Sequence, residues 1–216
     1  MNTMVAQTDI PNRTQRRASK TRNRLLKGAL SVFAEVGTEA ATIERITQRA
    51  DLGKGTFYRH FADKDEIVSE LVEQCVGSLL EAISKMVHQP HSLQEALDGL
   101  VNGHAEFFLT RREEYVMLFG SHMLLRLNGG PAPGVERLYE DYLCRIEELL
   151  RPVLPDQVDD LKLRCLACAI AGFVSGFLSF SMITMDPQAV KESMEAMRIA
   201  FLGGVMGLIE RSLSHV

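Results

Sequence analysis

The sequence lacks the residue patterns from which most enzyme active sites are built. It contains no Gly-rich phosphate loop, no G-x-S-x-G, no H-E-x-x-H and no paired carboxylates in a recognisable setting. Nucleophilic, phosphoryl-transfer and metal-dependent hydrolytic chemistry each need such residues at a defined spacing. We therefore expect a protein that is not an enzyme and that holds no cofactor or metal ion.

Cysteine is also scarce. Four cysteines in 216 residues are too few and too scattered for a disulfide framework. Cys165 and Cys168 form a C-x-x-C, but they lie in a long apolar helical run, and no second Cys or His pair occurs at zinc spacing. We expect core thiols here, with a metal or redox site as the alternative. Because no secretory segment opens the chain, we expect a cytoplasmic protein.

Charge is absent from Cys165 to Met185, a run of 21 residues that is long enough to span a bilayer. No cluster of Lys and Arg lies beyond Arg164, and the run contains four hydroxyl side chains, Ser175, Ser179, Ser181 and Thr184. These features favour a buried helix of a protein without membrane contact, with its remaining apolar face covered by dimerisation. A membrane-anchored helical protein is the alternative, which membrane fractionation would reveal.

Positive charge is concentrated in the first third of the chain. The formal net charge is -4 and the sequence pI is about 5.9. Residues 1–64 contain 12 Lys and Arg against 6 Asp and Glu, whereas residues 65–216 contain 12 against 22. A protein that is acidic as a whole can therefore still bind nucleic acid through its N-terminal third.

Apolar residues recur at helical spacing through most of the chain, and no β pattern or internal repeat is present. Residues 1–17 are polar, contain Pro11 and lack this periodicity, so we expect a flexible basic arm. The first helix is expected to begin after Ser19 and to end at Gly37, which supplies a left-handed residue. The fold predicted is all-α, with about nine helices.

Two short helices follow the first one. Thr42 is placed to cap the segment IERITQRA, and Asp51 and Gly53 then interrupt the helical pattern. The segment KGTFYRHF places Phe57 and Phe61 on one face at an i, i+4 spacing. Two short helices joined by a three-residue turn form a helix-turn-helix.

Longer helices are expected after this motif. Asp63 with Glu66, and Ser92 with Glu95, have the spacing of capping boxes that begin two of them. The segment 128–134, with three glycines and two prolines, is expected to be a loop. The predicted helices cover residues 63–86, 92–111, 113–127, 135–151, 157–184 and 187–213.

The stretch TIERITQRADLGKGTFYRHFADKDEIV resembles the DNA-binding signature of TetR-type repressors. That signature reads approximately T-V-x-x-I-A-x-x-A-G-V-S-x-G-T-L/F-Y-x-H/Y-F-x-x-K-x-x-L, and the segment GTFYRHF followed by Lys64 is the most specific part. The resemblance covers about 50 residues, including the first helix. It implies a three-helix DNA-binding domain over residues 18–64 and an effector-binding and dimerisation domain over residues 65–216.

The chain departs from this signature at two turn positions. Asp51 stands where the family usually has Gly, and Gly53 where it has Ser or Thr. Asp tolerates the left-handed conformation better than most residues, and Gly is an acceptable, weaker N-cap, so neither change should break the motif. Thr38 replaces the aromatic residue common after the first helix, and we expect looser packing there.

The motif predicts a set of residues that contact double-stranded operator DNA. Arg59 is the best candidate for reading a guanine, because a guanidinium spans O6 and N7, with a phosphate contact as the alternative. Thr42 is expected to contact a phosphate, Gly55 to allow close approach, and Thr56 to touch a thymine methyl or a phosphate. The resemblance implies backbone contacts for Tyr58 and His60, and we expect another from Lys64. Weaker candidates are Arg45 and Lys54 in the motif and, in the arm, Arg13, Arg16, Arg17 and Lys20.

The second domain is expected to bind a small-molecule effector and to form a homodimer, as the resemblance implies. Small residues recur at Gly172, Ser175, Gly176 and Ser179, and again at Gly203, Gly204 and Gly207, which favours close contact between the last two helices and their mates. Most apolar residues on the preceding helices belong to the core, and some of them are expected to touch a ligand. The candidates are His104, Phe107, Phe108, Met117, Phe119, His122, Met123, Tyr139 and Tyr142. The two histidines have a structural role as their alternative, and an activator or an effectorless regulator is the alternative to a ligand-released repressor.

Overall fold

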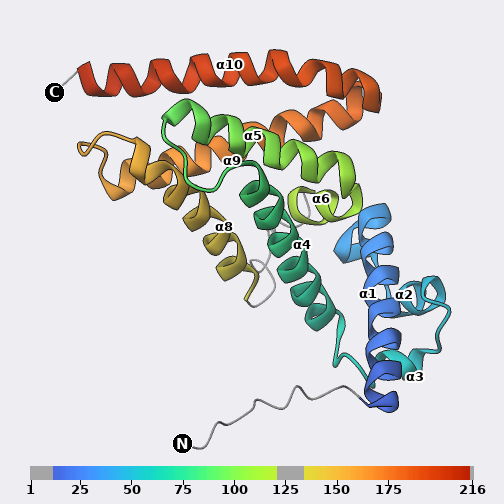
Figure 1. Cartoon of the computed structure of the whole chain (residues 1–216). Coiled ribbons are helices and arrows are strands. Elements are labelled where there is room, and N and C mark those ends of the chain that lie inside the picture. The colour runs from blue at the N-terminus through green and yellow to red at the C-terminus, as the bar shows by residue number, and fades with distance from the viewer. Residues whose placement is uncertain (1–11, 121–133, 215–216) are drawn as a thin grey trace, which may run out of the picture.

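The computed structural model describes residues 12–120 and 134–214. Within these ranges the chain forms nine α-helices and one 3₁₀ turn and no β-strand, in agreement with the all-α prediction (Figure 1). The elements are α1 (Arg13–Ala40), α2 (Ile43–Arg49), α3 (Lys54–Phe57), α4 (Lys64–Met86), α5 (Leu93–Thr110), α6 (Arg112–Phe119), α8 (Val135–Leu150), η1 (Arg151–Val153), α9 (Asp160–Thr184) and α10 (Pro187–Ser214). Helices α1 to α3 form a small unit at one end, and α4 leads from it into the larger bundle (Figure 1).

Helix α1 begins at Arg13, well before the predicted start near Ser19. Asn12 caps it: its side chain accepts a hydrogen bond of 2.9 Å from the Gln15 amide, and the Gln15 side chain accepts one of 2.7 Å from the Asn12 amide. The prediction of a flexible arm is therefore wrong for residues 13–17, because Arg, Gln and Ala are good helix formers even without an apolar stripe. Residues 1–11 lie outside the described residues.

The small unit follows the predicted caps closely. Gly37 adopts a φ of 78° and kinks α1 before its last residues, and Asp51 adopts the left-handed φ of 52° expected at the turn. Gly28 allows α1 and α2 to approach, since a Cβ there would lie 3.1 Å from both the Ala50 Cβ and the Ile46 carbonyl oxygen. The rings of Phe57 and Phe61 are buried with centroids 5.6 Å apart, as their spacing predicted.

The larger unit is a bundle in which α4 packs against α5 and α8, and α9 packs against α8 and α10. Gly103 brings α5 close to α4, because a Cβ there would lie 2.6 Å from the Ile83 Cα atom. Helix α6 contacts α1 and joins the two units. The predicted bounds agree with α4, α5, α8, α9 and α10 to within a few residues, whereas α6 ends at Phe119 and the remainder of the predicted helix and loop lies outside the described residues.

The two capping boxes form in a modified way. Asp63 and Ser92 each cap the predicted helix by accepting a hydrogen bond from the amide three residues later. The Glu66 carboxylate accepts its hydrogen bond from the Ala62 amide instead of the Asp63 amide, and Glu95 accepts from the corresponding earlier position. Each glutamate thus satisfies an amide one residue before the helix cap.

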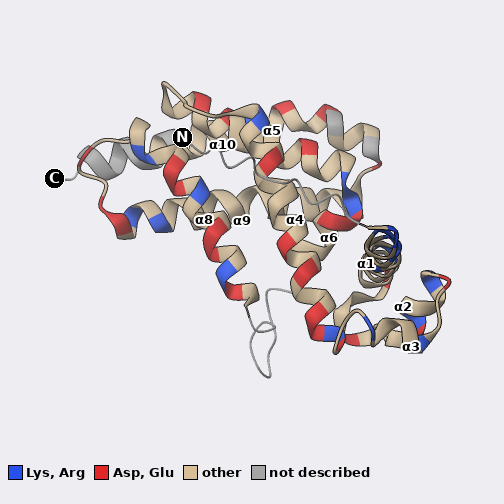
Figure 2. Cartoon of the chain, turned by 60° about the horizontal axis from the view of Figure 1, so that its bottom comes forward, with Lys and Arg blue, Asp and Glu red and all other residues tan. Residues whose placement is uncertain are grey.

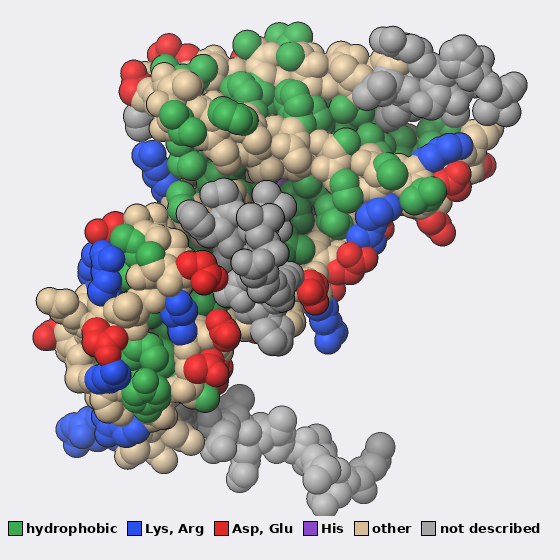
Figure 3. All heavy atoms as spheres, turned by 180° about the vertical axis from the view of Figure 1, so that it is seen from behind, with side chains coloured by type: hydrophobic (Ala, Val, Ile, Leu, Met, Phe, Trp, Pro, Cys, Tyr) green, Lys and Arg blue, Asp and Glu red, His purple; other side chains and the backbone are tan. Residues whose placement is uncertain are grey.

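Helices α9 and α10 leave a wide apolar face open on the described chain. One narrow side of α9 is buried, whereas Phe180 and Ile183 on another side are 72% and 79% exposed. Figure 3 shows hydrophobic side chains gathered over the elongated part of the molecule that these helices form. Helix α9 is long and apolar enough to cross a membrane by length and composition, and 28% of its most apolar window is buried. One side of α9 is therefore buried within the chain, and the rest of its apolar surface is the part for which the sequence predicts cover by a second copy.

Candidate nucleic-acid interface

Helices α2 and α3 and the turn between them form the predicted helix-turn-helix at the end of the molecule away from α9 and α10 (Figures 1 and 2). The Thr42 side chain caps α2 by accepting a hydrogen bond of 3.3 Å from the Arg45 amide. Thr42 is exposed, so the amides at the start of α2 face solvent beside its hydroxyl. Such a helix start attracts an anion, because its free amides and the helix dipole are both positive.

The recognition segment is shorter as a helix than the sequence predicted. Only Lys54–Phe57 is α-helical, and residues 58–60 continue as a hydrogen-bonded turn. Gly53 begins α3 without a side-chain hydrogen bond, as expected for a weaker cap. Nothing lies within 4 Å of a Cβ placed at Gly55, so packing does not require glycine there and the outer surface is open.

Two large side chains of this segment are exposed. Tyr58 is 53% exposed, although its ring also makes an edge contact with Phe57. The Arg59 guanidinium donates a hydrogen bond of 3.1 Å to the Thr56 hydroxyl, and no carboxylate of the described residues forms an ion pair with it. Arg59 is therefore a free cation whose direction is set by a neighbour in the same segment.

Two of the other cations predicted to contact DNA, Lys54 and Arg45, are held in ion pairs. Lys54 pairs with Glu44 across α2 and α3, and this hydrogen bond lowers the pKa of the Glu44 carboxyl and raises the pKa of Lys54. Arg45 lies 3.6 Å from a carboxylate oxygen of Glu35, which Arg49 also binds. Neither glutamate is predictable from local sequence, because their partners are 10 residues or more away along the chain.

Lys64 is the predicted phosphate contact whose geometry differs most from the expectation. Its ammonium donates hydrogen bonds to three backbone carbonyl groups at the end of α1, those of Thr38 (2.7 Å), Ala41 (3.2 Å) and Glu39 (3.3 Å). Lys64 therefore stabilises the segment that leads to Thr42.

His60 ends the recognition segment, and Arg22 of α1 lies near it. His60 is half-buried, and this burial lowers its pKa, with Arg59 and Arg22 adding to the effect. The Arg22 guanidinium lies 4.6 Å from the centroid of the Phe61 ring and pairs with Glu70 of α4. Arg22, which was not among the residues predicted for the site, thus connects α1 with Phe61 and with α4.

The residues expected to touch a ligand lie in the interior of the larger unit. His104, Phe107, Phe108, Met117 and Tyr142 are buried, and Phe119 and Tyr139 are half-buried and pack against them. His122 and Met123 lie outside the described residues. Most of the residues predicted to touch a ligand therefore lie in one cluster. Their burial is equally typical of core residues and of ligand contacts.

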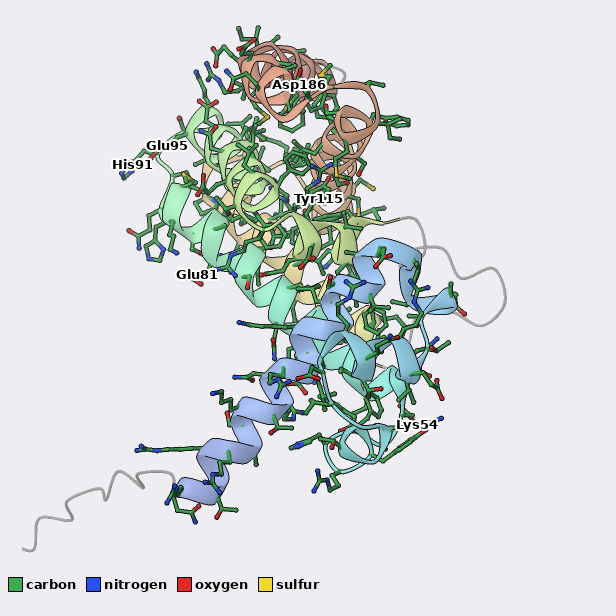
Figure 4. All side chains as sticks on the ribbon, turned by 90° about the vertical axis from the view of Figure 1, so that its right-hand side faces the viewer. Lys54, Glu81, His91, Glu95, Tyr115 and Asp186 are labelled. Atoms are coloured by element: carbon green, nitrogen blue, oxygen red, sulfur yellow. The ribbon has the colours of Figure 1, made fainter. Side chains whose placement is uncertain are left out.

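His104 and Tyr142 form a hydrogen-bonded pair inside this cluster. The Nε2 atom of His104 lies 2.6 Å from the Tyr142 hydroxyl, and its Nδ1 atom lies 2.7 Å from the Leu100 carbonyl oxygen. Burial lowers the pKa of His104 to about 4, so the imidazole is neutral. Tyr115, which was not among the predicted ligand contacts, is buried between Phe108 and Phe119 and donates a 2.7 Å hydrogen bond to the Ser175 carbonyl. Figure 4 shows Tyr115 within the larger unit. Its helical spacing to Phe119 was the available signal.

The small residues of α9 divide into two groups. Ser175 and Ser179 face the chain interior at Tyr115, whereas Cβ atoms at Gly172 and Gly176 would meet nothing within 4 Å. Gly203 and Gly204 of α10 are open in the same way. Among the described residues, these glycines therefore make no close contact with another helix.

The thiols of the C-x-x-C do not lie in the core of the chain. Cys165 and Cys168 are both exposed on α9, so the expectation of core thiols is wrong for them. No group of three or more potential metal ligands occurs among the described residues. Cys75 is the buried thiol, and burial raises its pKa to about 12.

Comparisons with known proteins agree with the motif. The family described as "Bacterial regulatory proteins, tetR family" matches residues 25–71. The chain is 30% identical over 140 residues to the transcriptional regulator TcmR of Streptomyces glaucescens, covering 64% of this chain and 59% of that protein. It is 28% identical over 181 residues to AcrR of Shigella flexneri, covering 78% of this chain and 81% of AcrR.

Solved structures share the fold over most of the chain. The fatty acid degradation regulator FadR of Bacillus halodurans matches 82% of this chain and 94% of its own, with a TM-score of 0.67 and 19% identity. FadR of Bacillus subtilis in complex with stearoyl-CoA matches 81% and 96%, with a TM-score of 0.61 and 17% identity. The chain spans about half to three fifths of the length of the first curated relatives it matches.

Proposed function

Because the chain belongs to the TetR family of bacterial transcriptional regulators, which are not enzymes, we propose that it represses transcription by binding a palindromic operator as a homodimer and that a small ligand releases it. In a two-fold dimer the two recognition segments would enter the major groove about one helical turn apart, or a multiple of it. We place the protein in the cytoplasm, where its operator lies.

One observation carries the DNA-binding part of this proposal. Arg59 is free of carboxylates and stands on a short, exposed segment beside Thr56 and Tyr58. A guanidinium so placed can span a guanine edge, while the capped start of α2 at Thr42 offers free amides to a phosphate. We therefore propose contacts from Thr42, Gly55, Thr56, Tyr58, Arg59 and His60, with Arg45 and Lys54 joining after their ion pairs open.

The open face of α9 and α10 supports the dimer. It carries Leu161, Phe180, Ile183 and Ile199, all more than 60% exposed, and the glycines that are unused within the chain. An apolar surface of this kind costs free energy in water, and a second copy with the same face would cover it in a four-helix contact. This covering also accounts for the apolar length of α9 without a membrane.

A buried aromatic cluster supports an apolar or amphipathic effector. Phe108 also lines a small cleft of about 150 Å³ between α5, α6, α9 and α10. The other residues that line it are Leu109, Met182, Met185 and Val190, with Arg112 as the one charged group among them. Phe108 contacts Tyr115, with ring centroids 4.9 Å apart, and Tyr115 is linked through Phe119 to Tyr142. Tyr142 and His104 are hydrogen-bonded to each other and would offer polar groups to a ligand inside an apolar setting. The Bacillus subtilis FadR complex supports only that the shared fold can hold an amphipathic ligand.

The proposal is tested by selecting bound duplexes from a random DNA library with the full chain, and by repeating the selection with a chemically diverse ligand library. Enrichment of an inverted repeat whose binding is lost with a ligand is expected. An enriched operator that no ligand releases would favour an effectorless regulator, and a reporter that rises with the protein would favour an activator. Absence of any enriched duplex would overturn the proposal.

A further inference from the structure

Helix α1 carries an unusual density of positive charge. No Asp or Glu occurs between Asp9 and Glu35, and the segment contains seven cations. At 3.6 residues per turn, six of them fall within an arc of about 100° on one side of the helix. We call this side the basic face of α1; it consists of Arg13, Arg16, Arg17, Lys20, Arg24 and Lys27.

The basic face is exposed and mostly unpaired. All six residues are exposed, and five of them have no ion pair or side-chain hydrogen bond with any described residue. Arg24 is the exception, since it binds the Asp51 carboxylate at 3.1 Å. Arg22, the seventh cation, lies on the opposite side, where it contacts Phe61 and Glu70. On the packed side of α1, the one cation, Arg22, is held by contacts within the chain. The cations without such contacts are all on the basic face.

The basic face adjoins the helix-turn-helix. Arg24 donates hydrogen bonds of 2.7 and 2.9 Å to the carbonyl oxygens of Ala50 and Asp51, in the turn that precedes α3. Figure 4 shows the N-terminal half of α1 and Lys54 of α3 at the same end of the molecule, with long side chains ending in nitrogen extending from α1 into free space. In Figure 2 the positive residues of α1, α2 and α3 lie at this end, whereas α4 and α5 carry mostly negative ones.

The dimensions suit a nucleic-acid backbone. From Arg13 to Lys27 the helix rises about 21 Å at 1.5 Å per residue, and each strand of duplex DNA carries one phosphate per about 3.4 Å of axis. Within the helix-turn-helix, by contrast, Lys54 and Arg45 are neutralised by glutamates and Lys64 is bound to carbonyl groups. Most of the positive charge that is free to bind phosphates therefore lies on α1.

We infer that the basic face of α1 is a second DNA-binding surface, which binds phosphates of the duplex held by α3 without reading its sequence. This inference rests on the proposed function. It assigns the electrostatic attraction to DNA to helix α1, where the sequence predicts a flexible arm. Counterion release at this face makes it the main source of the salt dependence of binding, while Arg59 and its neighbours supply sequence preference.

The test is a triple variant of the full chain, Arg16→Gln, Lys20→Gln and Lys27→Gln. Gln keeps the helix propensity, and none of these side chains has a partner to lose. The control removes three positive charges elsewhere, with Arg112→Gln, Arg137→Gln and Lys162→Gln. Lys162 has one weak, exposed ion pair, 3.5 Å from Asp159, so the melting temperature of the control is measured alongside its DNA binding. Both variants and the wild type are titrated with the selected operator and with a scrambled duplex at several salt concentrations, and with phosphatidylserine vesicles.

We expect the triple variant to lower the slope of log affinity against log salt by up to about 2.7 for each bound protomer, at 0.9 per neutralised phosphate. The loss of affinity should be equal for operator and scrambled DNA, and the control should keep the wild-type slope. If the triple variant binds the operator with the wild-type salt slope, this inference alone is overturned. It is also overturned if the control loses as much DNA affinity as the triple variant, or if the triple variant loses affinity for vesicles and none for DNA. A wild type that binds no DNA would overturn the proposed function as well.

Discussion

The Lys64 ammonium lies 2.7 Å from the carbonyl oxygen of Thr38, across the joint between α4 and the end of α1. Two further carbonyl groups accept hydrogen bonds from the same nitrogen, and the segment that they close leads directly to the α2 cap at Thr42. Lys64, which the motif predicts to contact DNA directly, thus also stabilises the start of α2, where Thr42 is expected to bind a phosphate.

The Lys64→Met variant separates these two roles. If Lys64 acts by positioning Thr42, operator affinity and melting temperature should both fall, while the salt slope stays at its wild-type value. A direct phosphate contact predicts a slope lower by about 0.9 per half-site instead. We expect the first result, since three carbonyl groups already occupy the ammonium protons. A double-mutant cycle with Thr42→Ala should be strongly non-additive, and additivity would contradict the positioning role.

Thr38 provides a stability prediction at the same joint. Its side chain is 3% exposed, and its hydroxyl has no hydrogen-bond partner among the described residues. An unsatisfied buried hydroxyl costs about 1 to 3 kcal/mol, so Thr38→Val should raise the melting temperature by several degrees. Thr47→Val is the control, because the buried Thr47 hydroxyl donates to the Ile43 carbonyl at 2.9 Å. Thermal unfolding that ranks Thr47→Val above Thr38→Val would contradict this reading.

His104 predicts how stability depends on pH. Burial lowers its pKa from 6.5 to about 4 in the folded chain, so the unfolded chain binds the proton first as the pH falls. The free energy of unfolding should therefore be insensitive to His104 above pH 6.5 and should decrease toward pH 4, by up to about 1.4 kcal/mol per pH unit. Urea unfolding between pH 7 and pH 5 checks this against His104→Gln. A variant that keeps the wild-type pH dependence would show that other groups cause it.

The dimer is tested at a glycine on the open face. A Cβ at Gly176 meets nothing within 4 Å in the single chain, so Gly176→Arg is tolerated by the protomer but places a charge in the proposed interface. Gly77→Arg is the matched control, since Gly77 is equally open on α4. Sedimentation at micromolar concentration should give a monomer for the first variant and dimers for the control and wild type. The proposed interface would be contradicted if the wild type is a monomer that binds the operator as a single copy, or if it partitions into membranes.

The sequence predicted those parts of the molecule that depend on neighbours within about one helical turn. Caps at Thr42, Asp63 and Ser92 and the left-handed Asp51 are local features, and all of them form. The pairing of Glu44 with Lys54 depends on how α2 meets α3, which local periodicity does not contain. The same limit explains why the sequence predicts a core position for Cys165, which is exposed on α9: the composition of an apolar helix does not show whether its own chain covers it.

Arg59 is the residue on which sequence discrimination is expected to depend. Its guanidinium forms no ion pair with a described carboxylate, so no ion pair must break before it binds DNA. The 3.1 Å hydrogen bond to the Thr56 hydroxyl orients the guanidinium along the recognition segment. A bidentate contact to guanine contributes about 1 to 3 kcal/mol of discrimination, so Arg59→Ala should lose that much on the operator and relax preference at one base pair per half-site. The Arg16→Gln, Lys20→Gln, Lys27→Gln variant should show the opposite pattern, with discrimination retained and salt dependence reduced. Both proteins are titrated against operators substituted singly at every position, at two salt concentrations. If Arg59→Ala weakens every operator equally, Arg59 binds a phosphate, and discrimination must come from Lys54, Thr56, Arg45 or the shape of the DNA.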